Sequence, residues 1–229
     1  MKAFFTALSF LTIFRLNLKD YDNKNAPAYF PLIGFLIGLT AYFVLSSDIY
    51  LKEIFALITI IVFTGALHLD GLADTADALF SHKDKIKKLE IMKDSRIGTM
   101  GAVTLIIVLI FKLNIFGNIS PGTIPVAMFF SRAVGTYIIS NSCYARAEGT
   151  GNFFKSYSFK ENLLIFLLSS LVLFIFINLK QYILISVISF ILARLLIRVF
   201  NFFFEGWTGD TIGASIEFSE IIILYLLSF

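Results

Sequence analysis

The sequence predicts an all-α, polytopic membrane protein with a single domain over residues 1–229. Hydrophobic residues make up 58% of the chain and charged residues only 15%, and the mean hydropathy is +0.84. A soluble domain carries about 25% charged residues, so this composition is typical of a chain that crosses a lipid bilayer. The apolar runs also recur at lengths close to the roughly 20 residues that a spanning helix needs.

Seven apolar runs are expected to span the membrane. The preceding Met1–Phe14 is apolar too, but it lacks a small-residue cleavage site, so we expect a retained interfacial helix and no signal peptide. The second run is expected to continue as helix into the acidic segment that follows it. The last run contains acids. The expected spans are Tyr29–Ser47, Ile54–Leu69, Thr99–Ile119, Pro121–Tyr144, Leu163–Leu179, Tyr182–Phe200 and Ile212–Phe229.

The basic residues predict the orientation of these spans. Cytoplasmic loops carry an excess of Lys and Arg, which here places the N-terminus in the cytoplasm and the C-terminus outside. Only Lys52, Lys112 and Lys180 fall on the other side, while Arg132, Arg194 and Arg198 lie within expected helices. The cytoplasmic set is Lys2, Arg15, Lys19, Lys24, Lys83, Lys85, Lys87, Lys88, Lys93, Arg96, Arg146, Lys155 and Lys160.

Four polar, glycine-bearing segments then fall on the same cytoplasmic face. They are residues His68–Asp77, Lys93–Gly101, Ala145–Phe154 and Glu205–Ala214. A pore or carrier would place its polar groups near the bilayer midplane instead. The sequence therefore predicts a multi-pass protein of the plasma membrane with its active site facing the cytoplasm.

The first of these segments contains three regularly spaced aspartates, Asp70, Asp74 and Asp77. Spacings of four and seven residues put all three carboxylates on one stripe of a helix. Like charges this close repel one another unless a cation lies between them. Mg²⁺ is a hard cation that binds carboxylate oxygens, so the stripe predicts a magnesium site for chemistry on a phosphate. His68 would point away from it, either bonded to backbone or in contact with substrate.

The other segments offer further candidates, each with a structural alternative. Glycines at a helix start after Lys93 and Arg96 favour a phosphate cradle, or else a solvated loop. Asp94 is a candidate fourth metal ligand or a base. Arg132 lies mid-helix, where a charge needs a partner or a wet cavity, so it is either part of a basic wall for a diphosphate or ion-paired. Three glycines exceed the needs of a turn and suggest close approach to a bulky ligand: Gly206, Gly209 and Gly213.

Composition also excludes some functions. The formal net charge of +3 is too small to indicate a nucleic-acid partner. The single cysteine, Cys143, excludes an internal disulfide.

Five ordered motifs resemble those of the cobalamin synthase family, the adenosylcobinamide-GDP ribazoletransferases. Three are HLDGLADTAD (68–77), MKDSRIG (92–98) and TGDTIGA (208–214), and two more are YFPLIGFLIG (29–38) and YARAEG (144–149). The resemblance covers nearly the whole chain. It departs from the family at Ala78, where a glycine is usual.

The resemblance implies a transferase acting on GDP-cobinamide and α-ribazole or its 5′-phosphate, releasing GMP. Asp70, Asp74 and Asp77, with Asp94 as a further candidate, would hold Mg²⁺; Asp94 or Asp210 would complete the metal site or take the ribazole hydroxyl proton. Lys93, Arg96, Arg132 and Arg146 would offset phosphate charge. It also implies a lipid bilayer as surroundings, with homo-oligomers or other nucleotide-loop enzymes as candidate partners.

Two other functions remain open at this point. A CDP-alcohol phosphotransferase also uses spaced aspartates at a membrane surface, but it expects an arginine where Asp74 stands after Ala73. A cation or corrinoid transporter would carry acids at the midplane, and Glu217 and Glu220 are the candidates for that role.

Overall fold

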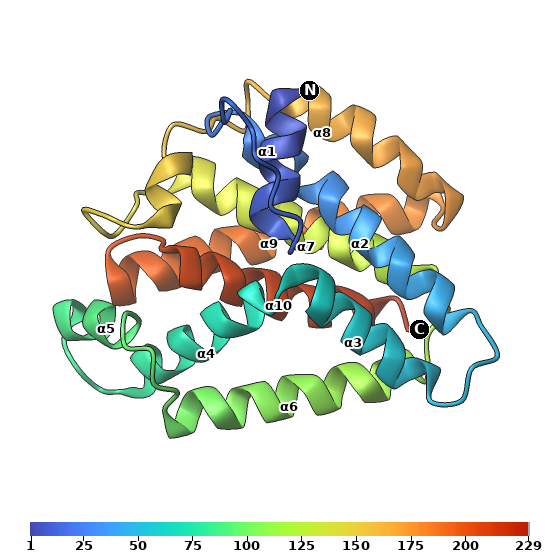
Figure 1. Cartoon of the computed structure of the whole chain (residues 1–229), viewed down its shortest axis with the longest axis horizontal. Helices are drawn as coiled ribbons and strands as arrows, with labels where there is room; N and C mark the ends of the chain where they lie inside the picture. Colours follow the sequence, from blue (N-terminus) through green and yellow to red (C-terminus); the bar gives the residue numbers. More distant parts are fainter. Residues whose placement is uncertain (229) are drawn as a thin grey trace.

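The computed structural model describes residues 1–228, which fold into helices joined by loops (Figure 1). Within these residues, extended structure is limited to one isolated bridge between Tyr144 and Trp207. The predicted all-α fold class is therefore confirmed. The α-helices are α1 (Lys2–Leu11), α2 (Phe30–Leu45), α3 (Lys52–Thr64), α4 (Leu67–Phe80), α5 (Lys85–Ile91), α6 (Thr99–Phe116), α7 (Thr123–Asn141), α8 (Leu163–Ser170), α9 (Leu179–Phe204) and α10 (Gly209–Leu226), and the 3₁₀ helices are η1 (Ala26–Tyr29), η2 (Thr150–Phe154) and η3 (Leu171–Ile175).

Four helices are long and apolar enough to cross a bilayer. They are α2 with η1 before it, α6, α7 and α9, with lengths of 18 to 26 residues. They coincide with four of the predicted spans. Large apolar side chains such as Ile110 on α6 and Phe190 on α9 are more than half exposed, as expected for faces that contact lipid tails. The membrane character is thus confirmed, whereas the count of seven spans stays a prediction.

The expected continuous helix from Ile54 into the aspartate segment is wrong. Helix α3 ends at Thr64, α4 begins at Leu67, and their axes differ by 86°. The break arises because Gly65 and Ala66 both adopt left-handed backbone conformations, with φ of 57° and 59°. Glycine takes this conformation freely, while alanine is strained there by about 1–2 kcal/mol. The bend turns α4 across the bundle, so that it packs against both α10 and α6.

A straight helix of spanning length is also not formed over Leu163–Leu179. The segment is helical as α8 and η3, over 13 residues in all. That length covers about 20 Å, well short of the roughly 30 Å hydrocarbon core. The hydroxyls of Ser169 and Ser170 donate to the carbonyls of Phe166 and Leu167, and such local bonds compete with regular helix geometry.

Helix α10 lies inside the bundle rather than facing lipid. It packs mainly against α4 and α7, and small buried residues such as Ala214 and Ser215 allow these close contacts. It also carries three acids, which the lipid-facing helices avoid. The predicted span here was Ile212–Phe229, and Phe229 lies outside the described residues.

Contacts join the four polar segments that were predicted to share one face. The Gly98 amide donates to Asp77 (2.7 Å), Arg146 pairs with Asp210 (2.8 Å), and Gly71 abuts the Asp210 backbone. In Figure 1 these connections gather at the end of the molecule that carries α5, away from the C-terminus. The grouping of the four segments is therefore confirmed.

Candidate active site

The site begins where α4 and α10 cross with almost no space between their backbones. A Cβ atom at Gly71 would lie 2.7 Å from the carbonyl oxygen of Asp210, and one at Gly213 would lie 3.2 Å from the Cα of His68. Only glycine permits such an approach. The crossing brings Asp70 on α4 beside Asp210 at the start of α10. Gly213 therefore has a packing role at this crossing.

Three carboxylates are crowded around this crossing: Asp70, Asp74 and Asp210. Asp74 lies on α4, which with 14 residues is too short to span a bilayer on its own. Partial burial, followed by the negative charges of Asp70 and Asp210, raises the pKa of Asp74 to about 7. Burial and nearby like charge both act in this direction, because each disfavours the ionised carboxylate.

A small cavity of about 80 Å³ opens onto this cluster. Two carboxylates, Asp70 and Asp210, share its wall with the imidazole of His68. The rest of the lining is largely apolar and comes from five α-helices (α1, α2, α4, α7 and α10), from η2 and from the loop before α10: Phe10, Leu11, Phe30, Leu67, Ile139, Gly151, Phe154, Trp207, Gly209, Ile212, Gly213 and Ile216. A space of this size admits one small group of a ligand, so a bulky ligand would remain largely outside it.

The loop before α10 is fixed by backbone contacts to the loop after α7. The Ala145 amide donates to the Trp207 carbonyl, and the Trp207 amide donates to the Cys143 carbonyl, both at 2.9 Å. Gly206 has φ of +152°, and a Cβ there would collide with the Cys143 backbone. The glycine at 206 is thus explained by packing. Thr208 caps α10 by accepting a hydrogen bond from the Thr211 amide.

Arg146 is held at the edge of the cavity by its ion pair with Asp210. The two side chains are largely buried, and the joining distance is 2.8 Å. Burial raises the pKa of Asp210 more than Arg146 lowers it. A second, more open hollow of about 430 Å³ lies next to it, with Arg146, Lys155, Tyr144 and Trp207 in its lining. Arg146 was expected near a phosphate from the sequence, whereas a site role for Tyr144, Trp207 and Lys155 was not.

Asp77 is engaged differently from the other two aspartates of its stripe. Its oxygens accept hydrogen bonds from the Gly98 amide (2.7 Å) and the Gly101 amide (2.8 Å). These amides belong to the first turn of α6, where free N–H groups and the helix dipole favour an anion. The glycines expected to cradle a phosphate therefore bind Asp77.

Asp94 lies in the loop between α5 and α6 and is paired with Arg96. Its oxygens accept three hydrogen bonds from the guanidinium, two of them from Nε and one from Nη2, and one from the Arg96 amide. These bonds lower the pKa of Asp94 to about 2. Lys93 is exposed in the same loop. Across residues 1–228, no hydrogen bond or ion pair links these three side chains to the carboxylates of α4, and their roles stay predictions.

Arg132 is ion-paired inside the bundle. It pairs with Glu220 of α10 and lies 3.4 Å from the imidazole of His68. Lys112, expected on the external face, is buried at 2% exposure and pairs with Glu217 and Glu220. The topological placement of Lys112 was wrong because its apolar neighbours gave no sign of acids that lie more than 100 residues away.

The side chains of residues 1–228 do not by themselves form a complete set of ligands for a metal ion. Among residues 1–228, no three acidic, histidine or cysteine side chains converge closely enough to hold an ion. The three carboxylates that come closest to forming such a metal site are those of Asp70, Asp74 and Asp210. Magnesium commonly takes one or two protein carboxylates and completes its shell with substrate phosphates and water. The residues present fit that kind of site, shared with a ligand.

Comparison with known proteins gives the family. The model of the family described as "Cobalamin-5-phosphate synthase" matches residues 3–228. The chain belongs to this family. It is thus a transferase of cobalamin biosynthesis, as the resemblance of its motifs indicated.

Relatives named "Adenosylcobinamide-GDP ribazoletransferase" match this family member over almost their whole length. The protein from Clostridioides difficile is 33% identical, covering 100% of this chain and 99% of the relative. The protein from Alkaliphilus oremlandii is 34% identical, covering 99% of this chain and 98% of the relative. The protein from Desulforamulus reducens is 35% identical, covering 96% of this chain and 94% of the relative. No solved structure matches the chain.

Proposed function

We propose that this chain transfers the cobinamide phosphoryl group from GDP-activated adenosylcobinamide to α-ribazole or its 5′-phosphate, releasing GMP. Full-length relatives carry the corresponding name. The structural observation that carries the proposal is the cavity wall shared by Asp70 of α4 and Asp210 of α10. Two of the family's motifs thereby contribute carboxylates to one small cavity.

In this reaction a ribazole hydroxyl oxygen attacks the phosphorus atom next to cobinamide. The new bond is O–P, and the bond that breaks joins this phosphorus to the bridging oxygen of the diphosphate. GMP leaves with that electron pair, and the hydroxyl proton passes to a carboxylate. Asp210 is the carboxylate we infer for this role, because it lines the cavity, whereas Asp94 is exposed and paired with Arg96.

We infer that Asp70 and Asp74 are the protein ligands of a magnesium ion shared with the diphosphate. The crowding of Asp70, Asp74 and Asp210 supports this, because the two neighbouring charges add to the effect of partial burial in raising the pKa of Asp74. Bound there, the metal would neutralise the diphosphate and the charge that develops on the leaving GMP. Asp77 is assigned to the start of α6 instead, because both its oxygens already accept amide hydrogen bonds.

Arg146 is the basic residue we assign to the phosphates. It lies at the junction of the small cavity and the wider hollow, where it pairs with Asp210. Arg132 is unavailable for this role because Glu220 neutralises it inside the bundle. The wide hollow, with Lys155 and two aromatic rings, offers stacking and charge for a nucleotide.

We infer that the site faces the cytoplasm, as the distribution of basic residues predicts. Cys143 provides the test, because it is the single cysteine of the chain, is exposed, and contacts the loop before α10. A membrane-impermeant maleimide should label it in inside-out vesicles and leave it unmodified in intact cells. Labelling of intact cells would reverse the orientation.

The activity is tested with purified protein in detergent, GDP-cobinamide, α-ribazole and Mg²⁺. We expect GMP and the joined corrinoid product in equal amounts, and loss of both when EDTA removes the metal. Turnover of a CDP-activated alcohol in place of GDP-cobinamide would identify a lipid-type phosphotransferase instead.

A further inference from the structure

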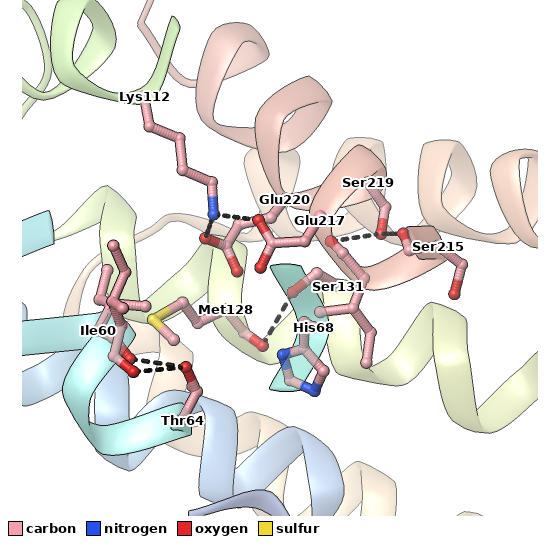
Figure 2. A network of polar contacts seen from close by, with 12 residues as sticks. Ile60, Thr64, His68, Lys112, Met128, Ser131, Ser215, Glu217, Ser219 and Glu220 are labelled. Carbon is pink, nitrogen blue, oxygen red and sulfur yellow. Dashed lines mark hydrogen bonds and ion pairs between the residues drawn. The ribbon is translucent and has the colours of Figure 1, made fainter. Parts of the chain in front are cut away.

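Four buried ionisable side chains form a neutral network in the interior of the bundle. Lys112 of α6 donates to Glu217 (2.6 Å) and Glu220 (2.8 Å) of α10 (Figure 2). Arg132 of α7 pairs with Glu220 as well. None of the four side chains is more than 5% exposed. Two positive and two negative charges compensate one another, as a low-dielectric interior requires.

His68 extends this network toward the cavity. Its Nδ1 atom lies 3.4 Å from the Nη2 atom of Arg132. A guanidinium has only N–H donors and no acceptor, so Nδ1 must be the acceptor and carries no proton. The ring proton is then on Nε2. In Figure 2 the imidazole lies on the side away from Lys112.

The Nε2 atom of His68 is buried and has no hydrogen-bond partner among residues 1–228. The side chain is 3% exposed, and it lines the same cavity as Asp70 and Asp210. Buried N–H groups are nearly always paired, because an unpaired one loses its hydration without compensation. A buried donor without an acceptor therefore belongs to a residue of the cavity wall.

We propose that His68 binds the ligand of this cavity by donating its Nε2–H to an uncharged oxygen, either a hydroxyl or an amide carbonyl. This inference rests on the proposed function and names one contact within that site. Arg132 is a positioning residue that fixes the imidazole tautomer, and Glu220 fixes Arg132. His68 is not the base of the reaction, because its bare nitrogen faces Arg132.

The surroundings of His68 favour an uncharged acceptor. The nearest positive charges, Arg132 and Lys112, are already neutralised by Glu217 and Glu220. The other polar groups of the cavity wall include two carboxylates, which repel an anion, and most of the lining is apolar. A phosphate at this position would lack a counter-charge.

Nitrogen NMR of the histidine rings tests the tautomer without any substrate. The chain has only two histidines, His68 and the exposed His82, and His82→Asn leaves a single ring to observe. Asparagine suits position 82, whose φ is 53°. We expect one protonated ring nitrogen, assigned to Nε2 by its couplings to both carbon-bound ring protons. A ring protonated on Nδ1, or on both nitrogens, would overturn the proposal.

Two substitutions at His68 test the contact itself. The amide nitrogen of glutamine reaches the place of Nε2, and that of asparagine reaches the place of Nδ1. We expect His68→Gln to keep kcat/KM within about threefold of the parent and His68→Asn to lower it about 10- to 100-fold. Equal losses in the two variants would reject the contact, and His82→Asn serves as the matched control.

A positioning role for Arg132 predicts a change that a purely structural role does not. Arg132→Lys keeps the charge but loses the planar fork that reaches both Glu220 and His68. We expect it to give a mixture of both imidazole tautomers in protein that still elutes as a folded species. An unchanged tautomer would remove Arg132 from this role. Absence of turnover by the parent protein would reject the proposed function alone, since the tautomer is measured without substrate.

Discussion

Helix α10 carries charge in two places, and the two are balanced in opposite ways. At its start, Asp210 meets Asp70 and Asp74 of α4, and within residues 1–228 these three carboxylates share one ion pair, with Arg146. Two to three turns further on, Glu217 and Glu220 meet Lys112 and Arg132 in equal numbers. The same helix therefore has an excess of negative charge at its N-terminal end and neutrality further along its length.

In the proposed function, the outer carboxylate cluster binds a ligand, whereas the inner ion-pair network stabilises the fold. An uncompensated charge in a membrane interior is costly, so the inner network had to be complete in the protein itself. The outer cluster lies at the rim, where water lowers the cost of repulsion. Its excess negative charge can be completed by a cation that arrives with the substrate.

Asp74→Asn removes charge from the outer cluster and should abolish most activity. If Asp74 holds the metal, we expect turnover to fall at least about a thousandfold, or roughly 4 kcal/mol of transition-state stabilisation. The melting temperature in detergent should stay level or rise, because carboxylate repulsion is relieved. The rate of GMP release and a thermal melt measure the two effects. Normal Mg²⁺-dependent turnover by this variant would reject the metal assignment.

The sequence predicted the aspartates of α4 but not the ion-pair network in the interior. Spacing alone put Asp70, Asp74 and Asp77 on one stripe, and hydropathy found four of the spans. The inner network was not predictable by the same means, because Lys112 and its acidic partners lie more than 100 residues apart. In the sequence, Glu217 and Glu220 stood out as acids within the last expected span, with no sign of the cations that pair with them.

The bend before α4 was hidden for a different reason. Gly65 is a common helix end, but the left-handed conformation of Ala66 is intrinsically unfavourable and is maintained by the packing around it. The role of Asp77 likewise depends on the amides of Gly98 and Gly101, which another segment brings to it. Periodicity fixes which face of a helix a residue occupies, and tertiary structure decides what meets that face.

Glu220→Gln breaks the inner network and should act on stability. The change leaves Arg132 without a counter-charge and Lys112 with Glu217 alone. We expect the free energy of unfolding to fall by about 3 kcal/mol, as for other buried pairs that lose one member. Denaturant unfolding in detergent, followed by circular dichroism, measures it.

The matched control for that variant removes one charge of each sign. Lys112→Met with Glu217→Gln leaves Arg132 and Glu220 as a neutral pair, so the loss should be about 1 kcal/mol or less. Equal losses in the single and double variants would show that charge balance does not govern the interior.

Asp77→Asn tests whether the third aspartate of the stripe belongs to the site or to the fold. The amide side chain can still accept one hydrogen bond, but it loses the charge that favours the first turn of α6. We expect a loss of about 1 kcal/mol in stability and an unchanged Mg²⁺ concentration for half-maximal turnover. A rise in that concentration as large as in Asp70→Asn would make Asp77 a metal ligand.

Asp94→Asn should have the smallest effect of the four, although the motif around it is one that marks the family resemblance. Asp94 is exposed, and its bonds run to Arg96 in the same loop, so its loss rearranges a surface loop without touching the carboxylate cluster. We expect GMP release to change less than about twofold, as for most surface substitutions. Arg96→Gln removes the other half of the pair and should match it. A large loss in Asp94→Asn alone would mean that the loop moves Asp94 into the cluster when substrate binds, and the excess negative charge at the rim would then involve a fourth carboxylate.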